Sequence, residues 1–86
     1  MYAASAEFLG TFLLIAVISF IGNAYAIGGA LTAAILLVGN ISGGHFNPAV
    51  SLWAYLAGKI TVDTLMAYIA AQTAAAASVV LLKKVI

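Results

Sequence analysis

The polar groups that could do chemistry in this chain are concentrated in one stretch, residues 39–51, which reads GNISGGHFNPAVS. Pro48 suits the first position of a helix, where its missing N–H costs nothing, and Asn47 directly before it is a strong N-cap. A capping Asn47 oxygen accepts from the backbone N–H of Ala49 or Val50, which leaves the two amide hydrogens free and fixed in direction. Because the helix dipole adds a partial positive charge at this end, the stretch predicts a site that welcomes a lone-pair oxygen and repels cations.

Glycines precede this cap and favour a path for small hydroxylic molecules. Gly43 and Gly44 permit unusual backbone dihedrals and leave their carbonyls unshielded, so the carbonyls from Gly43 through His45 and Phe46 could line a path as acceptors. A ladder of acceptors that ends at a fixed donor would pass water or small alcohols in single file. In a soluble protein Asn-Pro usually caps an ordinary helix, and this alternative fits less well between such apolar segments.

Other kinds of site lack the residues that they need. His45 is the only histidine and there is no cysteine, which leaves too few ligands for a metal and excludes thiolate chemistry. Ser42, Ser51 and His45 resemble part of a hydrolytic site, but no acidic residue is placed to orient the histidine. The sequence therefore predicts a protein that is not an enzyme and that binds neither a metal nor a cofactor.

Composition indicates an all-α integral membrane protein. Of the 86 residues 66% are hydrophobic and 6% are charged, and the mean hydropathy is +1.24. A soluble domain of this size has too much surface to hide so much apolar side chain, whereas lipid solvates it. The net charge of +1 and the absence of arginine leave no basic face for nucleic acid. We expect a multi-pass protein of the plasma membrane.

The apolar runs predict one domain, residues 1–86, with three spans and a half-helix. We expect spanning helices at about 3–22, 25–40 and 62–82, a re-entrant loop at 41–47 and a half-helix at 48–57. The half-helix covers only about 15 Å, half a bilayer. Irregular backbone at membrane depth is tolerated only where protein buries it or a watery cavity receives it, so a re-entrant loop points to a pore or a binding site. The alternative is a surface loop followed by an interfacial helix.

Three separate motifs resemble the aquaporin and aquaglyceroporin (major intrinsic protein) family. Residues 41–50, ISGGHFNPAV, resemble the family's first signature loop, residues 6–12 resemble its opening helix, and residues 68–72 resemble its third helix. The resemblance covers essentially the whole chain. Members of the family contain two inverted repeats, each with three spans and a half-helix, and the half-helix tips meet at the midplane. This chain resembles one repeat only, the first.

The resemblance implies roles for residues outside the signature loop. Glu7 lies one turn inside the first span, where a carboxylate is costly and functional by default. The family's glutamate accepts the N–H groups of the re-entrant loop, and Gln72 would assist it. For Glu7 the alternative is that the side chain reaches the membrane surface. The resemblance also places His45 at the pore wall.

The same resemblance implies an apolar constriction. Counting from Asn47, the constriction positions are Ile27, Ile35, Gly44 and Val50. The second repeat of the family carries an arginine after Asn-Pro-Ala, and this chain has valine there. Without that arginine we expect poorer selectivity for water, and glycerol or dissolved gases are further candidate permeants.

One repeat cannot enclose a pore, so the resemblance implies that two chains pair upside down relative to each other. Lys59 and the N-terminus fall on one side of the membrane and Lys83 and Lys84 on the other, which leaves almost no positive-inside bias. We expect a passive channel for water, with small neutral solutes as further candidate permeants, completed by an antiparallel homodimer, with four such pores from eight chains.

Three alternatives remain open at this point. The channel could conduct glycerol or gas with poor selectivity for water. The chain could be a non-conducting membrane scaffold, such as an isolated or engineered repeat. It could also be a piece of a longer protein, although the methionine at position 1 favours a separate chain.

Overall fold

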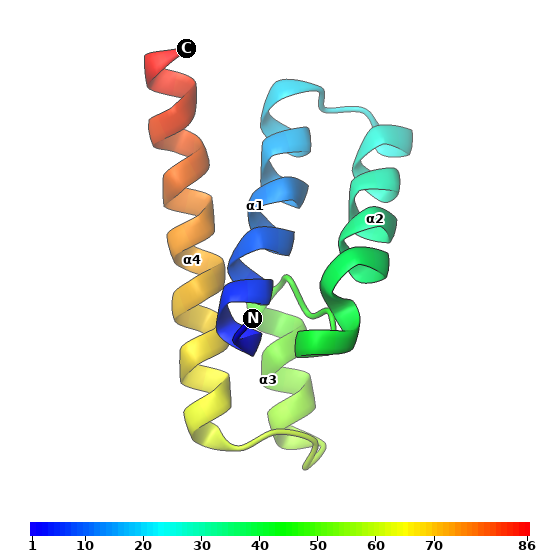
Figure 1. The fold of residues 1–86 in the computed structure, drawn as a ribbon, viewed down its shortest axis with the longest axis vertical. Helices are drawn as coiled ribbons and strands as arrows, with labels where there is room; N and C mark the ends of the chain where they lie inside the picture. Colours follow the sequence, from blue (N-terminus) through cyan, green and yellow to red (C-terminus); the bar gives the residue numbers. More distant parts are fainter.

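The computed structural model describes residues 1–86 and contains four helices and no strand. The helices are α1 (Ala3–Phe20), α2 (Ala24–Ser42), α3 (Pro48–Leu56) and α4 (Val62–Val85), shown in Figure 1. Three of them, α1, α2 and α4, are long and apolar enough to cross a membrane, and α3 is the short fourth helix. The expected fold class is therefore confirmed.

Helix α1 lies between α2 and α4, and α3 packs against α4 alone, beside its first half (Figure 1). Small residues fill much of the interior, because Ala6, Ala34, Ala54 and Ala75 are each 1% exposed or less. Small side chains let helices approach closely within a membrane. Most large apolar side chains face outward instead, as expected for helices that lipid surrounds.

Several helix ends differ from the expected residues, and backbone geometry explains two of these differences. Helix α1 ends at Phe20 rather than near residue 22, because Gly22 takes a left-handed φ of 81°. Helix α2 continues to Ser42 instead of stopping near residue 40, and Gly43 then ends it with a φ of 93°. The re-entrant loop is therefore shorter than the expected 41–47 and comprises residues 43–47.

The other helix ends lie within three residues of the expected positions. Asn23 caps α2, its side-chain oxygen accepting from Ala26 N–H at 2.9 Å. Helix α3 ends one residue before the expected residue 57, and α4 runs three residues past the expected residue 82. At its far end, Lys83 Nζ donates to the Ser19 carbonyl of α1 at 2.6 Å. This contact ties the ends of α1 and α4 together.

Candidate functional site

A buried carboxylate on α1 holds the re-entrant loop. Glu7 is 0% exposed, and its Oε1 accepts from Phe46 N–H at 2.7 Å and from Gln72 Nε2 at 2.9 Å. Its Oε2 accepts from Ser42 Oγ at 2.6 Å and from His45 N–H at 3.1 Å. All four partners are donors, which is the arrangement that satisfies an ionised carboxylate. Glu7 therefore does not reach the membrane surface.

These contacts set the direction of the loop carbonyls. In a trans peptide the N–H of one residue and the carbonyl of the preceding residue point in opposite directions, and the chain has no cis peptide. Because the N–H groups of His45 and Phe46 point at Glu7, the carbonyls of Gly44 and His45 point away from it. No hydrogen bond within the chain ends on the carbonyls of residues 43–46. The loop therefore presents free acceptors on the side opposite α1.

Asn47 stands at the tip of α3 in the conformation of an N-cap. Its Oδ1 accepts from Ala49 N–H at 2.7 Å, and Pro48 occupies the first helical position. The side chain is exposed, and its Nδ2 has no hydrogen-bond partner in the chain. Two amide hydrogens are thus available to an external acceptor beside the free carbonyls, with the positive end of the α3 dipole behind them.

Hydrogen bonds between α3 and α4 set the depth of this tip. Ser51 Oγ accepts from Gln72 Nε2 at 2.9 Å, and Gln72 is close to the middle of the 24-residue α4. Asn47 precedes Ser51 by about one helical turn, or roughly 5 Å. The Asn47 amide therefore lies near the middle of the span.

Three polar residues join this site without having been assigned to it from the sequence. Tyr68 Oη donates to the Ser42 carbonyl at 2.6 Å, and Ser42 Oγ accepts from Gly44 N–H at 3.2 Å. Ser51 connects Gln72 to the His45 ring, whose Nδ1 is 2.8 Å from Ser51 Oγ. Spacing offered a partial signal, because Tyr68 lies four residues before Gln72 and so shares its face of the helix.

The His45 ring is fixed by its neighbours while its carbonyl is free. Its Nδ1 shares a hydrogen bond with Ser51 Oγ, and that oxygen also accepts from Gln72 Nε2. The ring also meets the edge of Tyr68, with the centroids 5.1 Å apart. Through Ser51 and Tyr68 the ring fixes the loop to α3 and α4.

Phe46 contributes more than a carbonyl. It is 2% exposed and takes a left-handed φ of 56°, which is uncommon for an aromatic residue. Its ring lies directly over Gly10 of α1, where no Cβ could be accommodated. The ring therefore wedges the loop against α1.

A comparison with protein families gives a single clear result. The major intrinsic protein family matches the chain over residues 1–86. The chain belongs to this family. Its four helices, including α3 with the Asn47 cap, form one unit of this family.

Curated relatives agree with this assignment. Aquaporin NIP1-4 of Oryza sativa subsp. japonica is 43% identical over 88% of this chain and 33% of the relative. Aquaporin Z of Brucella melitensis is 42% identical over 79% of the chain and 36% of the relative. Aquaglyceroporin AqpS of Rhizobium meliloti is 37% identical over 83% and 37%. The chain spans about one third of the length of these relatives. No solved structure matches it significantly.

The structure brings together only part of the implied constriction. The Ile35 side chain and Gly39 flank Gly44, and Val50 is exposed on α3 one turn below Asn47. Ile27, however, lies eight residues before Ile35 on the same helix, which is about 12 Å along the axis. Within one chain, Ile27 therefore cannot join a ring with the other constriction residues.

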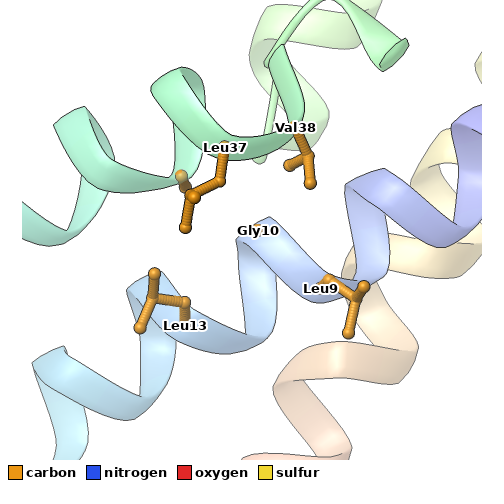
Figure 2. A pocket seen from close by; sticks show the side chains of 6 residues that line it. Leu9, Gly10, Leu13, Leu37 and Val38 are labelled. Atoms are coloured by element: carbon orange, nitrogen blue, oxygen red, sulfur yellow. The ribbon is translucent and has the colours of Figure 1, made fainter. Parts of the chain in front are cut away.

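A groove between α1 and α2 is a separate feature. It has a volume of about 160 Å³, and Figure 2 shows the side chains of Leu9, Leu13, Leu37 and Val38 beside Gly10. Ala34 completes the apolar lining. No polar side chain converges on it, so the groove lacks the donors and acceptors of the Asn47 site.

Proposed function

We propose that this chain forms half of a passive membrane channel for water and small neutral solutes. The observation that carries the proposal is the unpaired Asn47 amide, which lies at mid-depth beside a run of free carbonyls. A permeating water could give its hydrogens to the carbonyls and accept from Asn47. Membership in the major intrinsic protein family, and relatives named aquaporin and aquaglyceroporin, support the same function.

A second, inverted copy of the chain would complete the path. Asn47 and Val50 are exposed, and within one chain no hydrogen bond ends on the carbonyls of residues 43–46. An antiparallel partner would bring its own Asn47 to the same depth. Because Ile27 and Ile35 are about 12 Å apart along α2, the inverted partner could also bring its Ile27 near the Ile35 and Gly44 of the first chain. Four such pores, made of eight chains in the plasma membrane, extend the proposal.

This arrangement would exclude ions and protons. Two α3 helices would point their positive ends at the midplane, which repels cations and hydronium. A water whose oxygen accepts from both Asn47 amides cannot also accept a proton from the next water. The single file would therefore be interrupted as a proton wire, and the chain's own residues would perform no covalent chemistry.

Glycerol or a dissolved gas is the second candidate permeant. The constriction residues Ile35, Gly44 and Val50 carry no charge, and Ile27 of the partner would add another apolar side chain. An apolar ring holds water less firmly than one with arginine and better accommodates a carbon backbone. A ratio of glycerol to water permeability well above that of a strict water channel would favour this candidate.

The first prediction concerns Asn47→Asp. Aspartate also caps a helix, so the fold should persist, but the two amide donors are replaced by negative charge. We expect water permeability in proteoliposomes, measured by stopped-flow light scattering, to fall by at least about tenfold.

The matched control is Asn23→Asp. Asn23 caps α2 with the same geometry, 2.9 Å from Ala26 N–H, but at the end of the hairpin. Its permeability should equal that of the unchanged chain. Equal losses of permeability in the two variants would contradict a pore role for Asn47. If the chain without any substitution gave only the water permeability of empty liposomes, it would instead be a non-conducting scaffold.

A further inference from the structure

Two buried polar atoms have no hydrogen-bond partner in the chain. They are the hydroxyl oxygen Oγ1 of Thr11 on α1 and the amide oxygen Oε1 of Gln72 on α4. Both residues are 2% exposed, so their polar atoms are closed off from the surroundings of the chain. Nearly all buried polar atoms in native proteins are hydrogen-bonded, either to the protein or to an ordered water. A partner from outside the chain is therefore expected for both atoms.

The Thr11 hydroxyl differs from other hydroxyls in the spanning helices. Thr32, Thr73 and Ser78 each donate to a carbonyl one turn earlier in their own helix, at 2.9, 2.8 and 2.8 Å. Such a bond is a common way to satisfy a hydroxyl within a helix. Thr11 makes no such bond to the carbonyl of Glu7. Its proton is therefore available to another acceptor.

The Gln72 amide cannot turn to satisfy its own oxygen. Its Nε2 donates to Glu7 Oε1 and to Ser51 Oγ, both at 2.9 Å. These two bonds use both amide hydrogens. Exchanging the positions of the nitrogen and the oxygen would break both bonds and turn the oxygen toward a carboxylate. Gln72 Oε1 therefore needs a donor from elsewhere.

The packing of α1 on α4 places the two atoms in one interface. The helices lie side by side and run in the same direction (Figure 1). Glu7 meets Gln72 and Ser19 meets Lys83, at sequence separations of 65 and 64. Thr11 shares the Glu7 face of α1, because residues four apart are neighbours on a helix. Thr11 thus lies one turn beyond the Glu7–Gln72 pair, near the level of the fully buried Ala75, which presents only a methyl group.

A single water molecule suits this arrangement. Two O–H···O bonds of about 2.7–2.8 Å that meet at one oxygen span roughly 4.5–5.5 Å, which is close to one helical turn. Such a water donates to Gln72 Oε1 and accepts the Thr11 proton. Buried waters typically make about two to four bonds to groups that the protein leaves unsatisfied. Thr11 and Gln72 supply two such groups.

We propose that Thr11 and Gln72 bind a structural water between α1 and α4. The water fixes the amide of Gln72 from its oxygen side, while the hydrogens of that amide hold Glu7 and Ser51. The hydrogen-bond network of the loop thus extends one turn further along α1. The site is separate from the exposed Asn47 amide, so the inference does not depend on the proposed function.

Thr11→Val tests whether the hydroxyl has a partner. Valine has nearly the same shape, so removing a hydroxyl without a partner would stabilise the chain or leave it unchanged. Removing one that binds a water should instead lower the midpoint of thermal unfolding in detergent, followed by circular dichroism, by about 4–8 °C. The control is Thr73→Val, since Thr73 is exposed and bonds its own helix at Ile69. It should shift the midpoint by less than about 2 °C. An unchanged or raised midpoint in Thr11→Val would overturn the inference.

Solid-state NMR in bilayers separates a bound water from a direct bond between Thr11 and Gln72. Magnetisation from water protons should reach the methyl group of Ala75 several times faster than the methyl groups of Val79, which is 1% exposed one turn further along α4. In Thr11→Val this difference should disappear. Equal transfer to both residues in the unsubstituted chain would overturn the inference even if Thr11→Val lowers the midpoint, because a direct bond would then explain that loss. Neither measurement involves conduction, so failure here would leave the channel proposal standing.

Discussion

At the scale of single residues, the site depends on how fully Glu7 is satisfied. A carboxylate inside a membrane is costly unless it is paired and hydrogen-bonded. Here each of its oxygens accepts two hydrogen bonds, from the loop, from Ser42 and from Gln72. The same bonds that compensate the charge also fix the loop, so stability and carbonyl direction depend on one side chain.

Glu7→Gln should separate charge from shape. Glutamine is nearly isosteric, but its NH₂ group would face two of the donors that now point at a carboxylate oxygen. An unsatisfied buried donor costs about 1–3 kcal/mol, so we expect the free energy of unfolding in detergent to fall by about 2–5 kcal/mol. Permeability should fall with it. The control, Asp63→Asn in the exposed first turn of α4, should change stability by less than about 1 kcal/mol; a similar effect of both changes would contradict the role of Glu7.

At the scale of elements, one short loop joins helices that otherwise do not meet. Helix α3 contacts only α4, and the loop before it reaches α1 through Glu7 and through the Phe46 ring over Gly10. The left-handed φ of Phe46 turns that ring inward. The position of α3 relative to α1 therefore depends on a close approach that only glycine permits.

Gly10→Ala tests this close approach. The added methyl group would overlap the Phe46 ring, and overpacking of this kind costs about 1–3 kcal/mol. Thermal unfolding followed by circular dichroism should show the loss, and replacing Phe46 with leucine in the same chain should recover part of it.

Gly28→Ala is the matched control in another span. Nothing lies within 4 Å of a Cβ built at Gly28. Because alanine is the better helix former, this change should be neutral or stabilise by up to about 1 kcal/mol. If Gly28→Ala destabilised the chain as much as Gly10→Ala, the Phe46 wedge would not explain the result.

At the scale of the whole molecule, charge is nearly balanced between the two ends. Lys59 lies in the turn between α3 and α4, and Lys83 and Lys84 lie in the last turn of α4. Lys83 donates to Ser19 and sits 5.3 Å from the Phe20 ring centroid. Because that lysine is engaged within the chain, Lys84 is the one freer to interact with headgroups, and the orientation bias is small.

Complementary lysine variants test whether both orientations are needed. Lys59→Gln should place the C-terminal end of α4, which carries Lys83 and Lys84, in the cytoplasm. Lys84→Gln combined with Ala57→Lys should instead place the turn between α3 and α4 in the cytoplasm. Each variant expressed alone should lose water permeability in cells, and co-expression should restore it. Full permeability of either variant alone, with its single orientation verified by labelling at the termini, would contradict the antiparallel pore.

Much of the local structure could be predicted because it depends on neighbours in the chain. The three spans follow from apolar runs, and the Asn47 cap follows from Asn-Pro at the start of a short helix. The end of α2 was less predictable, since Asn40, Ile41 and Ser42 are compatible with either helix or loop. Their helical state is stabilised by contacts that Ser42 makes with Glu7 and Tyr68.

By itself, the sequence determined that this is an all-α membrane protein of the major intrinsic protein family, and that its polar groups lie in one loop. Only the tertiary structure decided which donors Glu7 collects, that Phe46 packs over Gly10, and that the His45 ring lies against Tyr68 and Ser51. The physical reason is separation along the chain. Apolar runs and caps act within a few residues, whereas Glu7 and Gln72 are 65 residues apart and meet only because of how α1 and α4 pack.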